Sequence, residues 1–216
     1  MKLSLSRPLT YLITSGTTTP ATTPSTEDFS KILEVISAAV TAKIDLVQLR
    51  EKSLSASVLY KLTVRAVALT RDTNTKLLVN DRADIAKAAG ADGVHLTSAS
   101  LRASTIRKTF GENLLVGVST HSLLEASVAR DDGADFAVFG PIFETASKQS
   151  YGEPLGWHQL TNVVRELQPF PIVALGGVSL ENANDCLEAG AAGVAGISLF
   201  NDLSRVNEVV KRIARC

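Results

Sequence analysis

Short apolar runs alternate with longer segments of helical periodicity along the whole chain. The short runs are mostly aliphatic or β-branched and do not alternate with polar residues, which is typical of strands buried on both faces of a parallel sheet. We expect strands at residues 9–14, 44–49, 76–79, 93–96, 115–118, 136–139, 172–175 and 193–197. We expect helices at residues 28–42, 56–71, 84–89, 103–110, 122–131, 157–168, 180–189 and 204–215.

Eight successive strand and helix pairs in 216 residues predict a closed (β/α)8 TIM barrel that forms a single domain over residues 1–216. A doubly wound open sheet is the alternative that the same alternation allows. Three of the expected helices are closed by a glycine shortly before the next strand, namely Gly90, Gly133 and Gly190. Glycine there supplies the left-handed residue that closes a helix, so these positions are interpreted as structural.

The charge balance and the hydropathy of the chain indicate which kinds of molecule it binds. Basic and acidic residues number 22 each and no basic stripe runs along the chain, so a nucleic-acid partner is not expected. No run of about 18 apolar residues could span a membrane, and the N-terminus lacks the apolar segment of a signal peptide, which favours a cytoplasmic protein. Cys186 and Cys216 fit unpaired thiols in a reducing compartment. We therefore expect small-molecule substrates, and the sequence leaves a homodimer open.

If the fold is a barrel, its active site lies where the strands end, and unusual side chains follow the expected strands there. Gln48, Arg50 and Lys52 lie within one turn at the end of the second strand. Arginine offers a planar fork of donors and lysine a mobile point charge, a pair that suits a diphosphate. The alternative is a solvated loop in which Arg50 pairs with Glu51.

Candidate catalytic and metal-binding side chains follow the next strands. Asp81 is a candidate Mg²⁺ ligand together with substrate phosphates, and a helix N-cap is the alternative role. His121 is a candidate general acid or base near neutral pH. His95 is expected to be a packed histidine at a strand end, and His158 beside Trp157 is expected at the surface.

Two later strand ends predict a phosphate site. Gly176-Gly177 and Ile197-Ser198 each precede an expected helix. Backbone N–H groups at such places bind anions, and barrels often build a phosphate site from the loops after strands seven and eight. A tight turn is the alternative for the glycine pair.

Two loops on the same face are candidates for contact with a ligand. Thr145, Ser147 and Lys148 indicate a loop that closes over an anion, with a mobile surface loop as the alternative. The Thr-, Pro- and Ser-rich segment 15–26 is expected to be a flexible loop at the active-site face, or an insertion with no role.

In combination, these motifs resemble the thiamine-phosphate synthase family, which also contains the TenI-type thiazole tautomerases. The resemblance extends in order from about residue 8 to residue 213. It rests on QLREK at 48–52, VNDR at 79–82, GADGVHL at 90–96, GVSTH at 117–121, FGPIF at 139–143 and ALGGV at 174–178. A member of this family would be a barrel enzyme of thiamine biosynthesis. It would join hydroxymethylpyrimidine diphosphate to a thiazole phosphate, forming thiamine phosphate and releasing diphosphate.

The resemblance implies a role for each matched position. By similarity, the pyrimidine diphosphate would be bound by Gln48, Arg50, Lys52, Asn80 and Lys148 with Ser119 nearby, Mg²⁺ by Asp81, the thiazole by Thr145 and Ser147, and its phosphate by Gly177, Ile197 and Ser198. Arginine, lysine and Mg²⁺ are suited to the negative charge that develops on a departing diphosphate.

Two departures from the synthase pattern favour the tautomerase alternative. Synthases usually carry an Asp, the second Mg²⁺ ligand, where this chain has Ser100, and the acidic residue after the first strand is absent. In a metal-free tautomerase, His121 would move a proton during aromatisation of a thiazole carboxylate phosphate. The retained Gln48, Asp81 and Lys148 favour the synthase, because a tautomerase has no diphosphate to bind. We therefore predict a synthase with weakened Mg²⁺ affinity, and the alternatives are a tautomerase and a non-catalytic phosphate-binding regulator.

Overall fold

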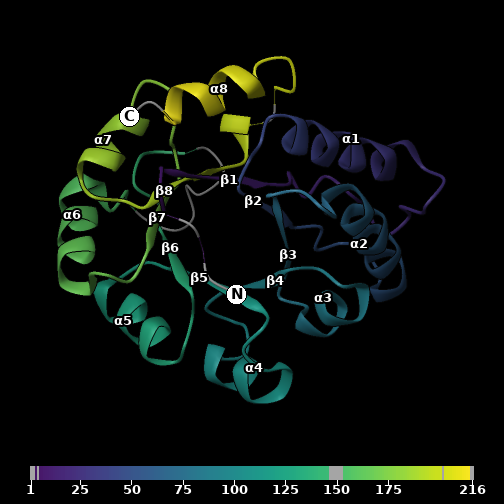
Figure 1. The fold of residues 1–216 in the computed structure, drawn as a ribbon, viewed down its shortest axis with the longest axis horizontal. Helices are drawn as coiled ribbons and strands as arrows, with labels where there is room; N and C mark the ends of the chain where they lie inside the picture. Colours follow the sequence, from purple (N-terminus) through teal and green to yellow (C-terminus); the bar gives the residue numbers. More distant parts are fainter. Residues whose placement is uncertain (1–2, 4, 146–152, 201, 215–216) are drawn as a thin grey trace.

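The computed structural model describes residues 3, 5–145, 153–200 and 202–214. They form a closed barrel of eight parallel strands inside a ring of helices (Figure 1). The strands are β1 (Leu9–Ile13), β2 (Leu46–Leu49), β3 (Lys76–Asn80), β4 (Gly93–Leu96), β5 (Leu115–Thr120), β6 (Phe136–Phe139), β7 (Ile172–Leu175) and β8 (Gly193–Gly196). The helices are α1 (Glu27–Thr41), α2 (Ala56–Thr70), α3 (Ala83–Ala89), α4 (Ala103–Phe110), α5 (Leu123–Asp131), α6 (Gly156–Leu167), α7 (Ala183–Glu188) and α8 (Val206–Ile213), with a short 3₁₀ helix, η2 (Ser198–Phe200), after β8.

The sheet closes because β1 pairs in parallel with both β2 and β8. The predicted (β/α)8 barrel is therefore confirmed, and the open doubly wound sheet is excluded. Gly90, Gly133 and Gly190 have φ angles of 78°, 87° and 91°, the left-handed conformation predicted for helix ends. Within the described residues, no helix is both long and apolar enough to cross a membrane.

Side chains alternate between the inside of the barrel and the layer beneath the helices. On β1, Tyr11 and Ile13 point inward and pack with other interior residues, whereas Leu12 belongs to the core between strands and helices. The Phe136 ring fills the interior beside Gly117, where an added Cβ would lie 2.4 Å from the ring. Phe136 thus fills the barrel interior near the amino ends of the strands. Polar interior residues lie between this ring and the carboxyl ends of the strands.

Two strands extend further than their apolar runs. β3 includes Asn80, which pairs with His95, and β5 continues past Val118 through Thr120 because Ser119 and Thr120 still pair with β6. Asn80 and Ser119 were expected in loops, and they lie instead on the strands themselves. Their side chains are therefore held by the sheet.

Two helices begin more than one residue later than predicted, α7 by three residues and α8 by two. Before α7, Asn182 Oδ1 accepts a hydrogen bond from the Ser179 N–H at 2.8 Å. Before α8, Asp202 Oδ1 accepts one from the Ser204 N–H at 3.0 Å. Such local bonds satisfy backbone groups without a helix, which accounts for the later starts.

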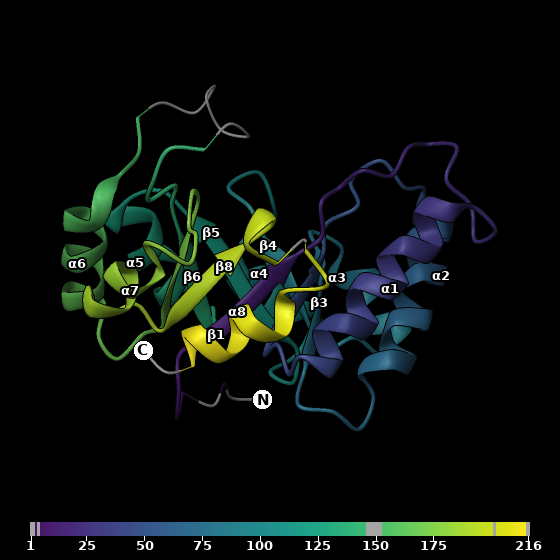
Figure 2. The same ribbon diagram turned by 90° about the horizontal axis from the view of Figure 1, so that it is seen from above.

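The segments that follow β1 and β6 leave the barrel at the same end, above the strands in Figure 2. This end carries the carboxyl ends of all eight parallel strands and is termed the mouth. In a (β/α)8 barrel, substrates bind at this end.

Candidate functional site

A chain of hydrogen-bonding side chains crosses the inside of the barrel just below the mouth. Gln48 Nε2 donates to Asn80 Oδ1 at 2.9 Å, and Gln48 Oε1 lies 3.4 Å from the Tyr11 hydroxyl. The Tyr11 hydroxyl also lies 3.0 Å from His95 Nδ1. His95 Nε2 in turn lies 2.8 Å from Ser119 Oγ. These five side chains, one from each of the strands β1 to β5, are termed the interior network.

Tyr11 and His95 form the buried centre of the interior network. They are 0% and 2% exposed, and Phe136 packs against both rings, at centroid distances of 5.8 and 6.3 Å. Burial, and secondly the positive charge of Arg50, lower the pKa of His95 to about 3. Burial raises the pKa of Tyr11 well above its ordinary value. Both rings are therefore uncharged near neutral pH.

The two cations predicted after β2 stand at the mouth. Arg50 is half-buried, and its charge acts on His95 of the interior network. Its backbone and guanidinium pack on Gly16, where an added Cβ would lie 3.1 Å from the Arg50 carbonyl oxygen and 3.2 Å from Nη1. Lys52 is exposed in the following turn. The guanidinium thus lies close to the backbone at Gly16, while the Lys52 ammonium group extends from an exposed turn.

Glu51 binds the segment after β1, so the alternative of a solvated Arg50–Glu51 pair is wrong. The Glu51 side chain is buried, with the residue only 3% exposed. Its Oε1 accepts from the Thr14 hydroxyl at 2.6 Å and the Gly16 N–H at 3.3 Å, and its Oε2 accepts from the Thr18 hydroxyl at 2.7 Å. Thr14 Oγ1 also accepts from the backbone N–H of Arg50 at 2.9 Å. This buried carboxylate therefore ties the segment expected to be flexible to the turn that carries Arg50.

Asp81 presents an exposed carboxylate at the end of β3. Its φ of 61° is left-handed, which is uncommon for a residue other than glycine, and its N–H donates to the His95 carbonyl at 2.8 Å. The N-cap of α3 is Arg82, so Asp81 is not a helix cap. Arg82 holds Asp84 by two hydrogen bonds of 2.9 and 2.6 Å, which lower the pKa of Asp84. Asp84 is thus paired with Arg82 in this structure.

Ser100, at the position of the missing carboxylate, is part of a turn after β4. Its Oγ accepts from the Thr97 N–H at 2.8 Å and lies 3.1 Å from Thr97 Oγ1. Across the described part of the chain, no group of three or more His, Cys, Asp or Glu side chains is arranged to hold a metal ion. A cation at the mouth would therefore depend on Asp81, water and oxygens of the substrate.

His121 lies beyond the end of β5 and contacts the segment after β6. Its Nδ1 contacts the carbonyl oxygen of Gly140, and its backbone N–H donates to Glu125 Oε2 at 2.6 Å. A carbonyl oxygen only accepts, so Nδ1 carries a proton and Nε2 is the ring nitrogen left to accept one. The geometry is compatible with a proton-transfer role for His121.

Gly176 and Gly177 let the segment after β7 pass close to the segment after β6. Their φ angles are 96° and 66°. A Cβ on Gly176 would lie 2.6 Å from Pro141 Cα, and one on Gly177 would lie 2.4 Å from the Glu144 carbonyl oxygen. Packing alone therefore requires glycine at both positions, whether or not an anion binds there.

The other predicted phosphate residues follow the neighbouring strand. Ile197 and Ser198 come after β8, which pairs with β7, and Ser198 begins η2. Ser198 is exposed and lines a cavity of about 210 Å³ together with Ser179 and Arg205. The ends of β7 and β8 thus bring Gly177, Ile197 and Ser198 to one side of the mouth.

Several predicted residues lie near or beyond the described part of the loop after β6. Thr145 is the last described residue before the gap and is half-buried. Ser147 and Lys148 lie outside the described residues, as does Cys216, so their predicted roles stay predictions.

Two expectations away from the mouth are confirmed. His158 is exposed and stacks on Trp157, with ring centroids 3.8 Å apart. Cys186 is a free, buried cysteine, and burial raises the pKa of its thiol to about 12.

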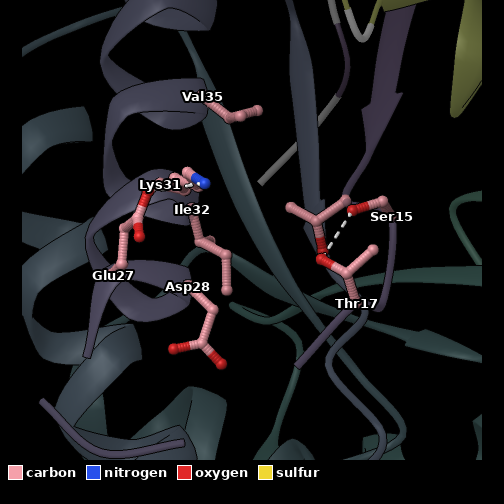
Figure 3. A pocket seen from close by; sticks show the side chains of 8 residues that line it. Ser15, Thr17, Glu27, Asp28, Lys31, Ile32 and Val35 are labelled. Atoms are coloured by element: carbon pink, nitrogen blue, oxygen red, sulfur yellow. Dashed lines mark hydrogen bonds and ion pairs between the residues drawn. The ribbon is translucent and has the colours of Figure 1, made fainter. Parts of the chain in front are cut away.

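A cavity of about 450 Å³ lies beside the mouth, between α1 and the segment after β1 (Figure 3). It is lined by Thr14, Ser15, Thr17, Glu27, Asp28, Lys31, Ile32 and Val35. Its ion pair between Glu27 and Lys31, at 2.7 Å, is solvent-exposed and contributes little. No residue of the interior network lines this cavity, so we place the candidate site at the mouth.

Sequence reasoning missed Tyr11, interpreted His95 as a packing residue, and considered Glu51 only in the alternative of a surface pair with Arg50. Tyr11 lies within an apolar run, which predicts a buried strand and gives no indication that the hydroxyl has a polar partner. The sequence could have revealed it, because Tyr11 lies two residues before Ile13 on the same strand and therefore points to the same side. That side is the barrel interior, which Gln48 also faces. His95 is indeed packed, as predicted, but it also joins two polar partners.

Comparisons with known proteins point in one direction. The profile of a family described as thiamine monophosphate synthase matches residues 19–200. A putative thiamine-phosphate synthase of Geobacter sulfurreducens is 46% identical over 167 residues, which span 77% of this chain and 78% of the relative. A thiamine-phosphate synthase of Alkaliphilus oremlandii is 37% identical over 186 residues, which span 86% and 87%. The solved structure of thiamine phosphate pyrophosphorylase from Pyrococcus furiosus superposes with a TM-score of 0.77 at 26% identity, covering 95% of this chain and 96% of the other.

Proposed function

Because this chain belongs to the thiamine monophosphate synthase family, we propose that it is a thiamine-phosphate synthase. It would join hydroxymethylpyrimidine diphosphate to a thiazole phosphate and release diphosphate. The observation that carries the proposal is the half-buried Arg50 beside the interior network, at the end of the barrel where substrates bind. A cation held over a polar interior is suited to a diphosphate, and the names of the relatives agree with this chemistry.

In the proposed reaction, the bond between the methylene carbon of the pyrimidine and a diphosphate oxygen breaks, and its electron pair leaves with the oxygen. The thiazole nitrogen then forms the new carbon–nitrogen bond. Arg50, Lys52 and Lys148 would bind the negative charge that develops on the leaving diphosphate. Gln48 and Asn80, already hydrogen-bonded to each other, would orient the same substrate.

Mg²⁺ would be held by Asp81 together with the substrate. Mg²⁺ commonly takes one or two carboxylates, several waters and substrate phosphates, so the single exposed carboxylate of Asp81 fits a cation that arrives with the diphosphate. When bound, the cation would help neutralise the leaving group. Since Ser100 supplies no charge, we expect weaker Mg²⁺ binding than two carboxylates would give.

The opposite side of the mouth would bind the second substrate. Gly177, Ile197 and Ser198 would contact the phosphate of the thiazole, with Thr145 and Ser147 near its ring. The proposed partners are thus small phosphorylated molecules, while a homodimer and a cytoplasmic location remain predictions.

The test is formation of thiamine phosphate from the two substrates at saturating Mg²⁺. We expect Arg50→Gln to lower kcat/KM by roughly a hundredfold or more, since it removes a charge-assisted contact to the leaving group. Arg71→Gln is the matched control, because Arg71 is exposed at the end of α2 and should leave the rate unchanged. Absence of product from the unmodified protein would refute the proposal.

A thiazole tautomerase is the second candidate, and Ser100 is the observation that favours it. A metal-free isomerisation needs no second carboxylate, and His121 has a ring nitrogen left to accept a proton. This function predicts isomerisation of the thiazole carboxylate phosphate in the presence of EDTA, with loss of turnover in His121→Ala. Unchanged turnover in His121→Ala would rule out the proton transfer. The non-catalytic regulator requires both assays to fail while phosphate ligands still stabilise the fold.

A further inference from the structure

Tyr11 and His95 have no role in the proposed function, although they join its predicted substrate residues. Tyr11 and His95 are 0% and 2% exposed, so in this structure neither can contact a substrate directly. Each lies within hydrogen-bonding reach of a residue that faces the mouth, Gln48 for Tyr11 and Ser119 for His95. Any influence on the reaction must pass through those neighbours.

The hydrogen-bond partners restrict where the protons of this chain lie. A neutral imidazole has one N–H and one acceptor nitrogen, and a phenol has one proton to donate. The Tyr11 hydroxyl can donate to His95 Nδ1 at 3.0 Å or to Gln48 Oε1 at 3.4 Å, and we assign its proton to the shorter contact, with His95. Nδ1 is then the acceptor, and the imidazole proton is on Nε2. His95 Nε2–H therefore donates to Ser119 Oγ at 2.8 Å.

The opposite order of protons would also give the contact between Tyr11 and Gln48 a donor, but that contact is long. Tyr11 would have to donate across 3.4 Å to Gln48, which is longer than the usual 2.5–3.0 Å of an O–H···O bond. In that order Ser119 would donate inward to His95 and present only lone pairs to the mouth. Lone pairs repel an anionic oxygen, whereas a hydroxyl proton binds it.

We propose that Tyr11 and His95 are positioning residues that keep the hydroxyl proton of Ser119 directed toward the mouth, where it donates to an anionic oxygen of the departing diphosphate. The inference rests on the proposed function for the identity of the acceptor. Its geometric basis is the inward parity of β5, since Gly117 faces the Phe136 ring and Ser119 lies two residues closer to the mouth on the same face. A donor fixed in advance stabilises developing charge without reorganisation at the moment of reaction.

The first test is the tautomer of His95 in the unmodified protein. Nitrogen-15 spectra of histidine-labelled protein distinguish a protonated ring nitrogen from an unprotonated one. The chain has three histidines, so the His95 signals are assigned by elimination with His121→Gln and His158→Gln. We expect a proton on Nε2 and none on Nδ1. A proton on Nδ1 would overturn the inference, and this measurement requires no enzymatic activity.

The second test is a double-mutant cycle on the rate of thiamine phosphate formation. Tyr11→Phe should lower kcat roughly tenfold in the unmodified background, about the worth of one net hydrogen bond, with a smaller change in KM. In the Ser119→Ala background the same substitution should change kcat less than roughly twofold, because the hydroxyl it orients is gone. Tyr60→Phe is the control, since the ring of Tyr60 lies exposed on α2.

The outcomes separate this inference from the proposed function. Equal effects of Tyr11→Phe in both backgrounds would indicate a general structural role and overturn the inference, with the synthase function intact. Absence of product from the unmodified protein would refute the function and leave the tautomer to be judged by its spectrum. If Tyr11→Phe does not fold, the tautomer measurement alone decides.

Discussion

The buried, uncharged His95 predicts a specific dependence of stability on pH. Burial, with a smaller contribution from the charge of Arg50, lowers the pKa of His95 to about 3 from its ordinary value of 6.5. Below pH 6.5 the unfolded chain binds a proton at this histidine and the folded protein does not. The free energy of unfolding must therefore fall as the pH falls from 6.5 toward 3, and this part of the stability is fully present above pH 6.5.

The magnitude follows from the distance between the two pKa values. A pH of 5 lies about 1.5 units below the pKa of the histidine in the unfolded chain, while the histidine in the folded protein remains neutral. The free energy of unfolding is therefore lower by about 2 kcal/mol than above pH 6.5. His95→Gln removes the titrating group and should abolish this share of the loss. His158→Gln is the matched control, because it makes the same replacement at an exposed position on α6.

Urea unfolding at pH 8 and pH 5 measures the effect. Between pH 8 and pH 5, the free energy of unfolding of the unmodified protein should fall by about 2 kcal/mol more than that of His95→Gln. Taking this difference cancels the contribution of carboxylates, which titrate in both proteins. A difference that stays constant between pH 8 and pH 5 would refute the buried neutral histidine and the proton order inferred from it.

Three further predictions concern single substitutions and one thiol. Glu51→Gln should lower the free energy of unfolding by roughly 3 kcal/mol, because the amide NH₂ that replaces one carboxylate oxygen cannot accept from Thr14 or Thr18. Glu34→Gln is the exposed control and should change the free energy of unfolding little. Equal effects of the two substitutions in urea unfolding would contradict this. Gly177→Ala should lower the free energy of unfolding by at least about 2 kcal/mol more than Gly90→Ala. Both glycines are left-handed, but only a Cβ at position 177 would meet the Glu144 carbonyl oxygen. Similar midpoints of urea unfolding for the two variants would contradict this, because they would show that the loop moves to accept the added Cβ. Cys186 should resist a thiol reagent in native Cys216→Ser protein and react after denaturation, because its thiol is buried with a pKa of about 12; rapid native reaction would contradict the packing.

The barrel could be predicted because its signal is local and repeated. Each apolar run followed by a helical segment can be recognised from a few neighbouring residues. Two strands extend beyond their predicted ends because the polar residues Asn80 and Ser119 still pair with the next strand. The two late helix starts have a different cause. Side chains such as Asn182 and Asp202 compete for backbone N–H groups, and propensity does not reveal which partner wins.

The candidate site was only partly predictable because its contacts are long-range. Arg50 and Asp81 were found by type and by place after a strand, and the barrel does bring them to the mouth. The partners of Glu51 lie 33 to 37 residues earlier in the chain, so its burial could not be seen beside Arg50. Tyr11 and His95 are 84 residues apart, and only the closure of the barrel brings them into contact.

A side-by-side assay of the two candidate reactions tests the central claim most directly. One preparation of the protein is given hydroxymethylpyrimidine diphosphate and thiazole phosphate with Mg²⁺, and a second portion is given the thiazole carboxylate phosphate with EDTA. A synthase is expected to form thiamine phosphate and diphosphate in equal amounts in the first reaction, and Arg50→Gln should slow the formation of both by roughly a hundredfold or more. No thiamine phosphate in the first reaction, with rapid His121-dependent isomerisation in the second, would contradict the account.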